Sequence, residues 1–111
     1  MENVNPQEQI DAEFERAEQA RLRGNEGQAR VCARRAAGIA TREYFARRGE
    51  TIRTPSAYDL LNLLIEDFSL SDELREIAMH LTLRVNEEFK LPTDIDLIVE
   101  AKKLCEGLLI G

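Results

Sequence analysis

Several features that serve catalysis are scarce in this sequence. It contains one histidine, two cysteines and no tryptophan, and aromatic residues make up 5% of the chain. A single histidine cannot build a histidine-rich metal site, and the six glycines are too scattered to form a phosphate-cradling loop. No serine or cysteine stands in a recognisable nucleophile context. These absences argue against a metalloenzyme and a P-loop nucleotidase, and we expect neither a metal nor a cofactor.

Long apolar runs are also absent. No run approaches the roughly 18 residues that a bilayer-spanning helix needs, and residues 1–6 lack the basic start and apolar stretch of a signal peptide. Cys32 and Cys105 fall inside helical patterns and fit neither a disulfide framework nor a zinc spacing. We therefore expect a cytoplasmic protein in which both thiols are reduced and buried.

The residues that are present are typical of one helical domain. The chain has 111 residues, of which 43% are hydrophobic and 32% charged, and this length fits a single domain. Its leucines, isoleucines and alanines recur at helical spacing, and no alternating strand pattern occurs. The pattern predicts an all-α fold, an antiparallel up-and-down bundle of four to five helices over residues 1–111. Residues 1–5 are expected to be flexible.

Caps and breakers divide the chain into five expected helices. These cover residues 6–23, 26–48, 56–68, 72–89 and 94–109. The expected N-terminal caps are Asn5, Asn25, Ser71 and Thr93. Gly24 and Gly49 are expected to terminate the first two helices in the left-handed conformation. The apolar C-terminal end, residues 108–110, is expected to dock either across the bundle or across a dimer interface.

Charge is distributed unevenly along the chain. The net charge is −6, yet residues 21–53 hold nine arginines and three glutamates, a local charge of +6. Such a basic island can attract an acidic partner, RNA or a nucleotide. It can equally pair with acidic neighbours inside the bundle. Both interpretations stay open at this point.

Four arginines of the second helix are candidate ligand-binding residues. Arg30, Arg34 and Arg42 are expected near one face of that helix, with Arg35 off it. Their guanidinium groups are suited to phosphate. No aromatic residues are interleaved with them to stack nucleobases, so the nucleic-acid pattern is incomplete.

Arg75 and His80 form the one candidate catalytic pair. A histidine can take the 2′-hydroxyl proton of RNA as general base while an arginine stabilises charge on the phosphate. Five residues of helix rotate the two side chains by roughly 140°, so they would flank the apolar stripe rather than converge. The alternative is a surface charge ladder at a spacing of four, formed by Glu76, His80 and Arg84.

The order of segments resembles the HEPN family, named for a nucleotide-binding helical domain of higher eukaryotes and prokaryotes. The resemblance rests on residues 24–40, which read GNEGQARVCARRAAGIA and precede the aromatic Tyr44. It also rests on residues 56–68, which begin SAYDLL, and on the terminal helix from Asp94. Together the similarity covers about residues 8–109.

This resemblance implies a bundle of four to five helices that is often dimeric. Such domains are commonly encoded beside a minimal nucleotidyltransferase, and many act in toxin–antitoxin or defence systems. Active members cleave RNA through an arginine and a histidine four to six residues apart, a spacing that Arg75 and His80 match. The family places this motif near its final helix, whereas here it falls on the fourth, and the acidic Glu76 follows the arginine. These departures argue against nuclease activity and favour an inactive or binding version.

Three functional hypotheses follow. The leading one is a non-catalytic HEPN-like module that self-associates and binds a partner protein, with a nucleotide or RNA against the arginine-rich helix. The partner would be a minimal nucleotidyltransferase. The second is a metal-independent ribonuclease that uses Arg75 and His80. The third is a purely structural or regulatory bundle.

Overall fold

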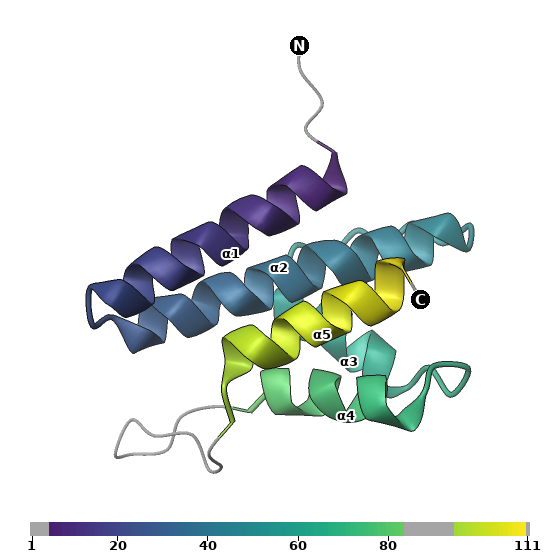
Figure 1. Ribbon diagram of the computed structural model, residues 1–111. Coiled ribbons are helices and arrows are strands. Elements are labelled where there is room, and N and C mark those ends of the chain that lie inside the picture. Colours follow the sequence, from purple (N-terminus) through teal and green to yellow (C-terminus); the bar gives the residue numbers. More distant parts are fainter. Residues whose placement is uncertain (1–4, 84–94, 111) are drawn as a thin grey trace.

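The structure is a computed structural model, and it describes residues 5–83 and 95–110. Within these ranges the chain is all-helical, and no residue lies in a strand. The helices are α1 (Pro6–Leu22), α2 (Glu26–Arg47), α3 (Ala57–Ile65), α4 (Asp72–Leu81) and α5 (Leu97–Leu109). The predicted all-α helix bundle is confirmed (Figure 1). None of these described helices is long and apolar enough to cross a bilayer.

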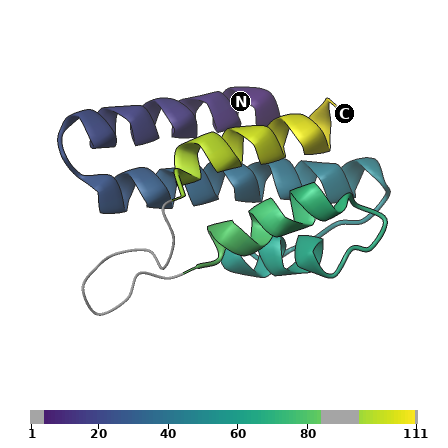
Figure 2. The ribbon, with the colours of Figure 1, turned by 60° about the horizontal axis from the view of Figure 1, so that its bottom comes forward.

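α2 is the central helix of the bundle. α1, α3 and α5 pack on it, while α4 packs on α3 and α5. Figures 1 and 2 show α1 and α2 as an antiparallel pair joined by a short turn, whereas α5 runs in the same direction as α2. The α2 surface that these helices cover is built from fully buried alanines, Ala29, Ala33, Ala36, Ala37 and Ala40. Because alanine is small, neighbouring helices can approach the α2 backbone closely.

Local sequence signals set most helix starts. Asn5, Asn25 and Ser71 each accept a hydrogen bond from the backbone N–H three residues further on, as their cap positions predicted. Gly24 and Gly49 follow α1 and α2 with φ angles of +78° and +83°, which confirms them as left-handed terminators. Of the stretch expected to be flexible, residues 1–4 lie outside the described residues.

The fourth helix is shorter than its apolar pattern predicted. α4 ends at Leu81, and not at Phe89. In a longer helix the Leu81 carbonyl would accept from the N–H four residues further on. It accepts instead a hydrogen bond from Arg34 Nε at 2.8 Å. The carbonyl of Leu83 accepts one from Arg34 Nη2 at 3.0 Å. Val85 and Phe89, the last members of the predicted stripe, lie outside the described residues.

The third helix also ends earlier than predicted. α3 stops at Ile65 rather than at Phe68. The side chain of Asp67 explains this, because its Oδ1 accepts a hydrogen bond from the backbone N–H of Ser69 at 3.1 Å. Such a side-chain turn competes with helix continuation.

The fifth helix begins with a different cap from the one predicted. The side chain of Asp96 caps α5, since its Oδ1 accepts hydrogen bonds from the backbone N–H groups of Ile98 and Val99. Thr93, the predicted cap, lies outside the described residues. Three polar residues precede this helix in close succession, and the apolar periodicity alone does not decide which of them is the cap.

Candidate ligand-binding site

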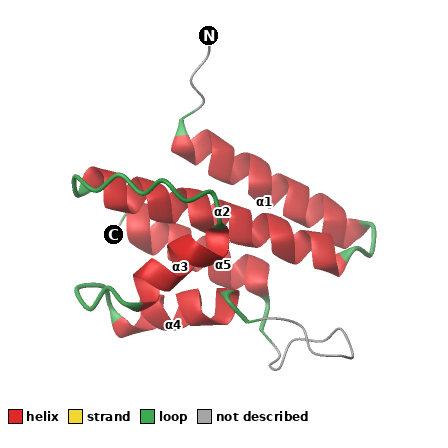
Figure 3. Ribbon diagram, turned by 180° about the vertical axis from the view of Figure 1, so that it is seen from behind, coloured by secondary structure: helices red, strands yellow, loops and turns green. Residues whose placement is uncertain are grey.

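A pocket of about 450 Å³ lies between α2 and the segment that leads into α3. Figure 3 shows this segment running back along α2 before α3 begins. The α2 wall of the pocket consists of Val31, Arg34, Arg35, Gly38, Ile39 and Arg42. The opposite wall consists of Pro55, Ala57, Tyr58 and Leu60. α1 contributes one residue, Glu13.

Gly38 allows the start of α3 to lie against α2. A Cβ atom added at this position would lie 3.1 Å from the Cβ and 3.3 Å from the Cα of Ala57. Both distances are shorter than Cβ atoms usually make, so a larger residue would push the two walls of the pocket apart. Gly38 was not among the candidate residues, although a glycine inside a helical pattern often has a packing reason.

The segment before α3 is fixed by hydrogen bonds. Arg42 Nη2 donates to the Thr54 carbonyl, which attaches this segment to α2. The Thr54 hydroxyl donates to Asp59 Oδ2 at 2.9 Å. The backbone N–H of Asp59 donates to the hydroxyl of Ser56 at 3.2 Å and so caps α3. The wall of the pocket is therefore organised before any ligand binds, which lowers the entropic cost of binding.

Arg34 forms the most buried part of the basic surface. Arg34 as a whole is only 9% exposed. Its guanidinium group donates to the carbonyls of Leu81 and Leu83. The same group lies 5.4 Å from the ring centroid of Tyr58, within reach of a cation–π interaction. Arg34 thus holds the end of α4 and also brings positive charge to the pocket.

Arg35 and Arg42 present donors that the protein leaves unused. Arg35 is exposed and has no hydrogen-bond or ion-pair partner among residues 5–83 and 95–110. The expectation that Arg35 lies off the face of Arg42 is wrong, because seven residues of α-helix bring a side chain back to within about 20°. Arg34, Arg35 and Arg42 therefore converge on one pocket.

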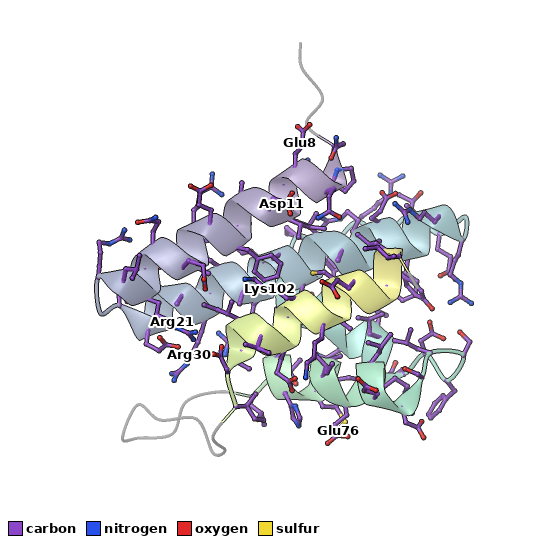
Figure 4. The ribbon with its side chains drawn as sticks, viewed as in Figure 1. Glu8, Asp11, Arg21, Arg30, Glu76 and Lys102 are labelled. Atoms are coloured by element: carbon purple, nitrogen blue, oxygen red, sulfur yellow. The ribbon has the colours of Figure 1, made fainter. Side chains whose placement is uncertain are left out.

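Arg30, the fourth candidate, does not line this pocket. It lies near Arg21, at the end of the bundle where α5 begins (Figure 4). The pKa of Glu26 in this region is lowered, chiefly by its hydrogen bond with Arg21 and to a smaller extent by the charge of Arg30. Arg30 therefore belongs to a different surface from the other three arginines.

Glu13 is the one acidic residue of the pocket. Its side chain is 14% exposed, and its Oε2 atom lies 3.3 Å from Nη1 of Arg16. Its Oε1 atom is buried and has no hydrogen-bond partner among the described residues. Because Oε1 has almost no accessible surface, Glu13 lines the pocket through its other atoms. No sequence pattern points to Glu13, because only the packing of α1 on α2 brings it to the pocket.

The arginines of residues 21–53 fall into two groups. One group pairs with acids of the bundle and the other lines the pocket, so each of the two interpretations applies to part of this basic island. Part of it pairs with acids inside the bundle, in the ion pairs Arg21–Glu26, Arg21–Asp96, Arg47–Glu43 and Arg48–Asp67. Arg48 also lies over the ring of Tyr44 at 5.1 Å from its centroid. Arg35 and Arg42, which line the pocket, make no ion pair with an acid in the described part of the chain. Internal pairing and ligand attraction thus involve different residues.

Arg75 and His80 turn toward different neighbours. Arg75 donates to the Ile65 carbonyl through Nε at 2.9 Å and Nη2 at 2.7 Å, and it lies 4.1 Å from the ring centroid of Phe68. His80 Nδ1 lies 2.7 Å from Glu100 Oε1 on α5. The structure therefore does not bring the two side chains together at a shared open site. Arg84, the third member of the predicted charge ladder, lies outside the described residues.

Glu76 completes the surroundings of His80. Glu76 Oε1 lies 3.7 Å from His80 Nε2, one turn away on α4. Its side chain is 70% exposed and points to the outside of the bundle (Figure 4). Both ring nitrogens of His80 therefore face carboxylates, an arrangement that attracts cations and repels phosphate.

The cysteines and acids of the described residues offer no alternative chemical centre. Cys32 and Cys105 are buried and unbonded to each other, as expected. Burial raises the pKa of the Cys105 thiol to about 12, so this thiol is protonated at neutral pH and is a poor nucleophile. No group of three or more metal-ligating side chains occurs in this part of the chain.

The site is thus a pocket with guanidinium groups, one carboxylate residue and apolar walls. Its volume falls within the range of about 300–1,000 Å³ that small-molecule sites occupy. Comparisons of the chain with protein-family models, with curated proteins and with solved structures gave no match.

Proposed function

We propose that this chain is a non-catalytic binding module that takes a small anionic ligand of the nucleotide class in the pocket beside α2. One observation carries the proposal: Arg34, Arg35 and Arg42 line the same pocket, and two of them hold donors that no described residue uses. A surface arginine that serves only solubility has no need of such convergence.

Arginine is suited to this task because its planar guanidinium group donates two parallel hydrogen bonds to a phosphate. Arg42 keeps one donor on the Thr54 carbonyl, which fixes its position. Arg35 is held only through its backbone, so it can swing toward a bound phosphate. The first turn of α3 adds partial positive charge at the opposite wall, since Ala57 and Tyr58 line the pocket there.

The rest of the pocket suits the base of a nucleotide. Ile39 and Leu60 supply apolar surface, and Tyr58 supplies an aromatic ring. Tyr58 and Leu60 stand on the first turns of α3, whose place is fixed by the contact of Ala57 with Gly38. An isolated phosphate would make no contact with these apolar and aromatic side chains. The pocket therefore favours a ligand with both an anionic and a planar apolar part.

The proposal agrees with the resemblance to the HEPN family, since residues 24–40 include Arg34, Arg35 and Gly38. Self-association and binding of a minimal nucleotidyltransferase belong to the same proposal and stay predictions. The ribonuclease alternative has less support, because Arg75 is bound to a backbone carbonyl and His80 to Glu100. The purely structural alternative does not account for the convergence of arginines.

Calorimetric titration with nucleoside monophosphates tests this proposal. The wild type is expected to bind, and Arg35→Ala is expected to bind roughly 10- to 100-fold more weakly, because a hydrogen bond to a charged group is worth about 1.5–3 kcal/mol. Arg30→Ala is the matched control, with the same substitution on the same helix outside the pocket. It is expected to bind like the wild type.

Affinity should also fall as salt is added, because the main attraction is between charges. Light scattering of the same samples counts the subunits. The proposal fails if the wild type binds no nucleotide at millimolar concentration, or if Arg30→Ala and Arg35→Ala weaken binding equally.

A further inference from the structure

We infer that two copies of this chain associate through the outer face of α5, with the two α5 helices antiparallel. This inference rests on the self-association that is part of the proposed function, and it involves none of the residues of the pocket beside α2. It starts from a stripe of exposed residues on α5, namely Val99, Lys103, Glu106 and Ile110.

The residues of this stripe share one face of the helix. They are spaced by four, three and four residues, which is the spacing of contact positions in paired helices, and they fall within about 60° around the axis. Ile110 follows the last residue of α5 but continues the helical turn, since its N–H donates to the Glu106 carbonyl at 2.9 Å. Val99 is 46% exposed and Ile110 is 80% exposed. The stripe therefore presents an apolar residue at each end and two charges between them.

The two charges of the stripe are not used within the described part of the chain. Neither the ammonium group of Lys103 nor the carboxylate of Glu106 has a hydrogen-bond or ion-pair partner there. The stripe as a whole is neutral, although the net charge of the chain is −6. Two copies that meet at this face therefore repel each other less than they would at a face of net negative charge.

The order of the residues makes the stripe complementary to itself. The midpoint between Val99 and Ile110 is also the midpoint between Lys103 and Glu106. A two-fold axis through this point, perpendicular to α5, sets Val99 opposite Ile110 of the partner subunit. It also sets Lys103 opposite Glu106 of the partner subunit. Each of these pairs occurs twice in such an isologous contact, whereas a parallel alignment would set lysine against lysine and is disfavoured.

Hollows on both sides of α5 leave its outer face open to a partner helix. Figure 1 shows α5 between α1 and α4. Toward α1, a hollow of about 400 Å³ has Asp11 and Phe14 in its wall. Toward α4, a hollow of about 480 Å³ has Leu74 in its wall. Glu106 and Ile110 border both hollows. Side chains beside the stripe of a second copy can enter these hollows and enlarge the buried area.

Sedimentation equilibrium of the full chain at concentrations up to millimolar tests this inference. The wild type is expected to dimerise. Lys103→Glu sets two carboxylates against each other twice in each dimer and is expected to weaken association about tenfold or more. Combining Lys103→Glu with Glu106→Lys restores both opposite-charge pairs at unchanged net charge and is expected to restore the dimer.

The apolar ends of the stripe are tested by Ile110→Ser. This variant removes an apolar contact twice in each dimer and is expected to weaken association about tenfold or more. Leu22→Ser is the matched control, because Leu22 is 79% exposed and lies on α1, outside the stripe. It is expected to dimerise like the wild type. Circular dichroism and thermal melting check that each variant is folded.

Cysteine cross-linking tests the antiparallel alignment. Chains with Val99→Cys and chains with Ile110→Cys are oxidised separately and as a mixture. Facing positions come within reach of a disulfide, whereas positions of the same number lie about 16 Å apart along the helix pair. Cross-linked dimers are therefore expected only from the mixture. The native Cys32 and Cys105 are buried and interfere little.

The outcomes separate the inference from the rest of the proposed function. A wild type that stays monomeric at millimolar concentration overturns both the inference and self-association, whether the stripe faces solvent or binds another protein. Nucleotide binding is a separate measurement and is not touched by that result. A wild-type dimer that Lys103→Glu and Ile110→Ser leave intact, or cross-links between positions of the same number, overturns the inference alone.

Discussion

The pocket beside α2 and the Arg75–His80 pair on α4 differ in where their polar groups are directed. In the pocket, Arg35 has no partner among the described residues, and Arg42 uses one of its donors on the Thr54 carbonyl. On α4, Arg75 gives two donors to the Ile65 carbonyl, and His80 lies 2.7 Å from Glu100. The first region has hydrogen-bonding capacity left for a ligand. In the second region, Arg75 and His80 already use their hydrogen-bonding groups on other parts of the protein.

This difference separates binding residues from structural ones more sharply than residue type does. Arginines occur in both regions, and both regions carry an acid. A guanidinium group that satisfies a helix-end carbonyl stabilises the fold, and recruiting it for a phosphate would break that contact. A guanidinium group at a pocket wall with free donors has no such cost.

The largest effect on stability is expected at Arg34, the internally bonded arginine of the pocket. Arg34→Met removes its hydrogen bonds to Leu81 and Leu83 and leaves both carbonyls without that donor. Unfolding in urea should show a loss of about 2–4 kcal/mol. Arg30→Met serves as control and should lose less than about 0.5 kcal/mol. Equal stability of Arg34→Met and wild type would contradict a structural role for Arg34.

A smaller effect is expected at His80. His80→Ala removes the contact with Glu100, whose side chain is 16% exposed, and should destabilise the fold by about 1–2 kcal/mol. RNA incubated without metal should stay intact with the wild type and with the variant, as read on a denaturing gel. RNA cleavage by the wild type that His80→Ala abolishes, with stability unchanged, would reverse the assignment of the two regions.

A pH-dependent effect of less than about 1 kcal/mol is expected at Arg21, whose ion pairs are partly exposed. Its hydrogen bonds are the main cause of the lowered pKa values of Glu26 and Asp96, whose ordinary values are 4.5 and 3.8. Groups with a lowered folded-state pKa stabilise the fold above these values, and the stabilisation is lost as pH falls through the folded-state pKa.

The stability advantage of the wild type over Arg21→Gln should therefore be complete at pH 6 and shrink toward pH 3. Urea unfolding at several pH values measures it. Arg30→Gln keeps both ion pairs of Arg21 and removes only the smaller effect of the Arg30 charge on Glu26, so it should stay much closer to the wild-type profile than Arg21→Gln does. An advantage that grows on acidification would show that these carboxylates do not gain from Arg21.

The smallest effect on stability is expected at Arg35. Since no described residue bonds to its guanidinium group, Arg35→Ala should change the free energy of unfolding by less than about 0.5 kcal/mol. The same variant should lose nucleotide affinity. Thermal melting with and without nucleotide measures both quantities, and a large loss of stability without ligand would show that Arg35 is bonded within the fold.

The sequence predicted those parts of the fold that depend on neighbours along the chain. Asn5 and Asn25 cap helices because their side chains reach an N–H three residues away. The end of α4 escaped prediction because the donor that takes the Leu81 carbonyl, Arg34, lies 47 residues earlier. No periodic pattern contains that information.

The same division holds for the candidate site. Arg34, Arg35 and Arg42 were recognised from composition, and a correct helical angle would have joined Arg35 to Arg42. Glu13 was missed, because only the packing of α1 on α2 brings it to the pocket. Arg75 and His80 match the spacing of a ribonuclease motif. That spacing does not reveal that Arg75 is hydrogen-bonded to the Ile65 carbonyl and His80 to Glu100.

Nucleotide binding beside α2 can be located by following the backbone amide signals of ¹⁵N-labelled protein by NMR while AMP is added. We expect shifts that saturate and that centre on residues 31–42 and 55–60, with residues 74–81 of α4 little affected. Shifts that centre on Arg75 and His80, or no shifts at millimolar AMP, would contradict binding beside α2.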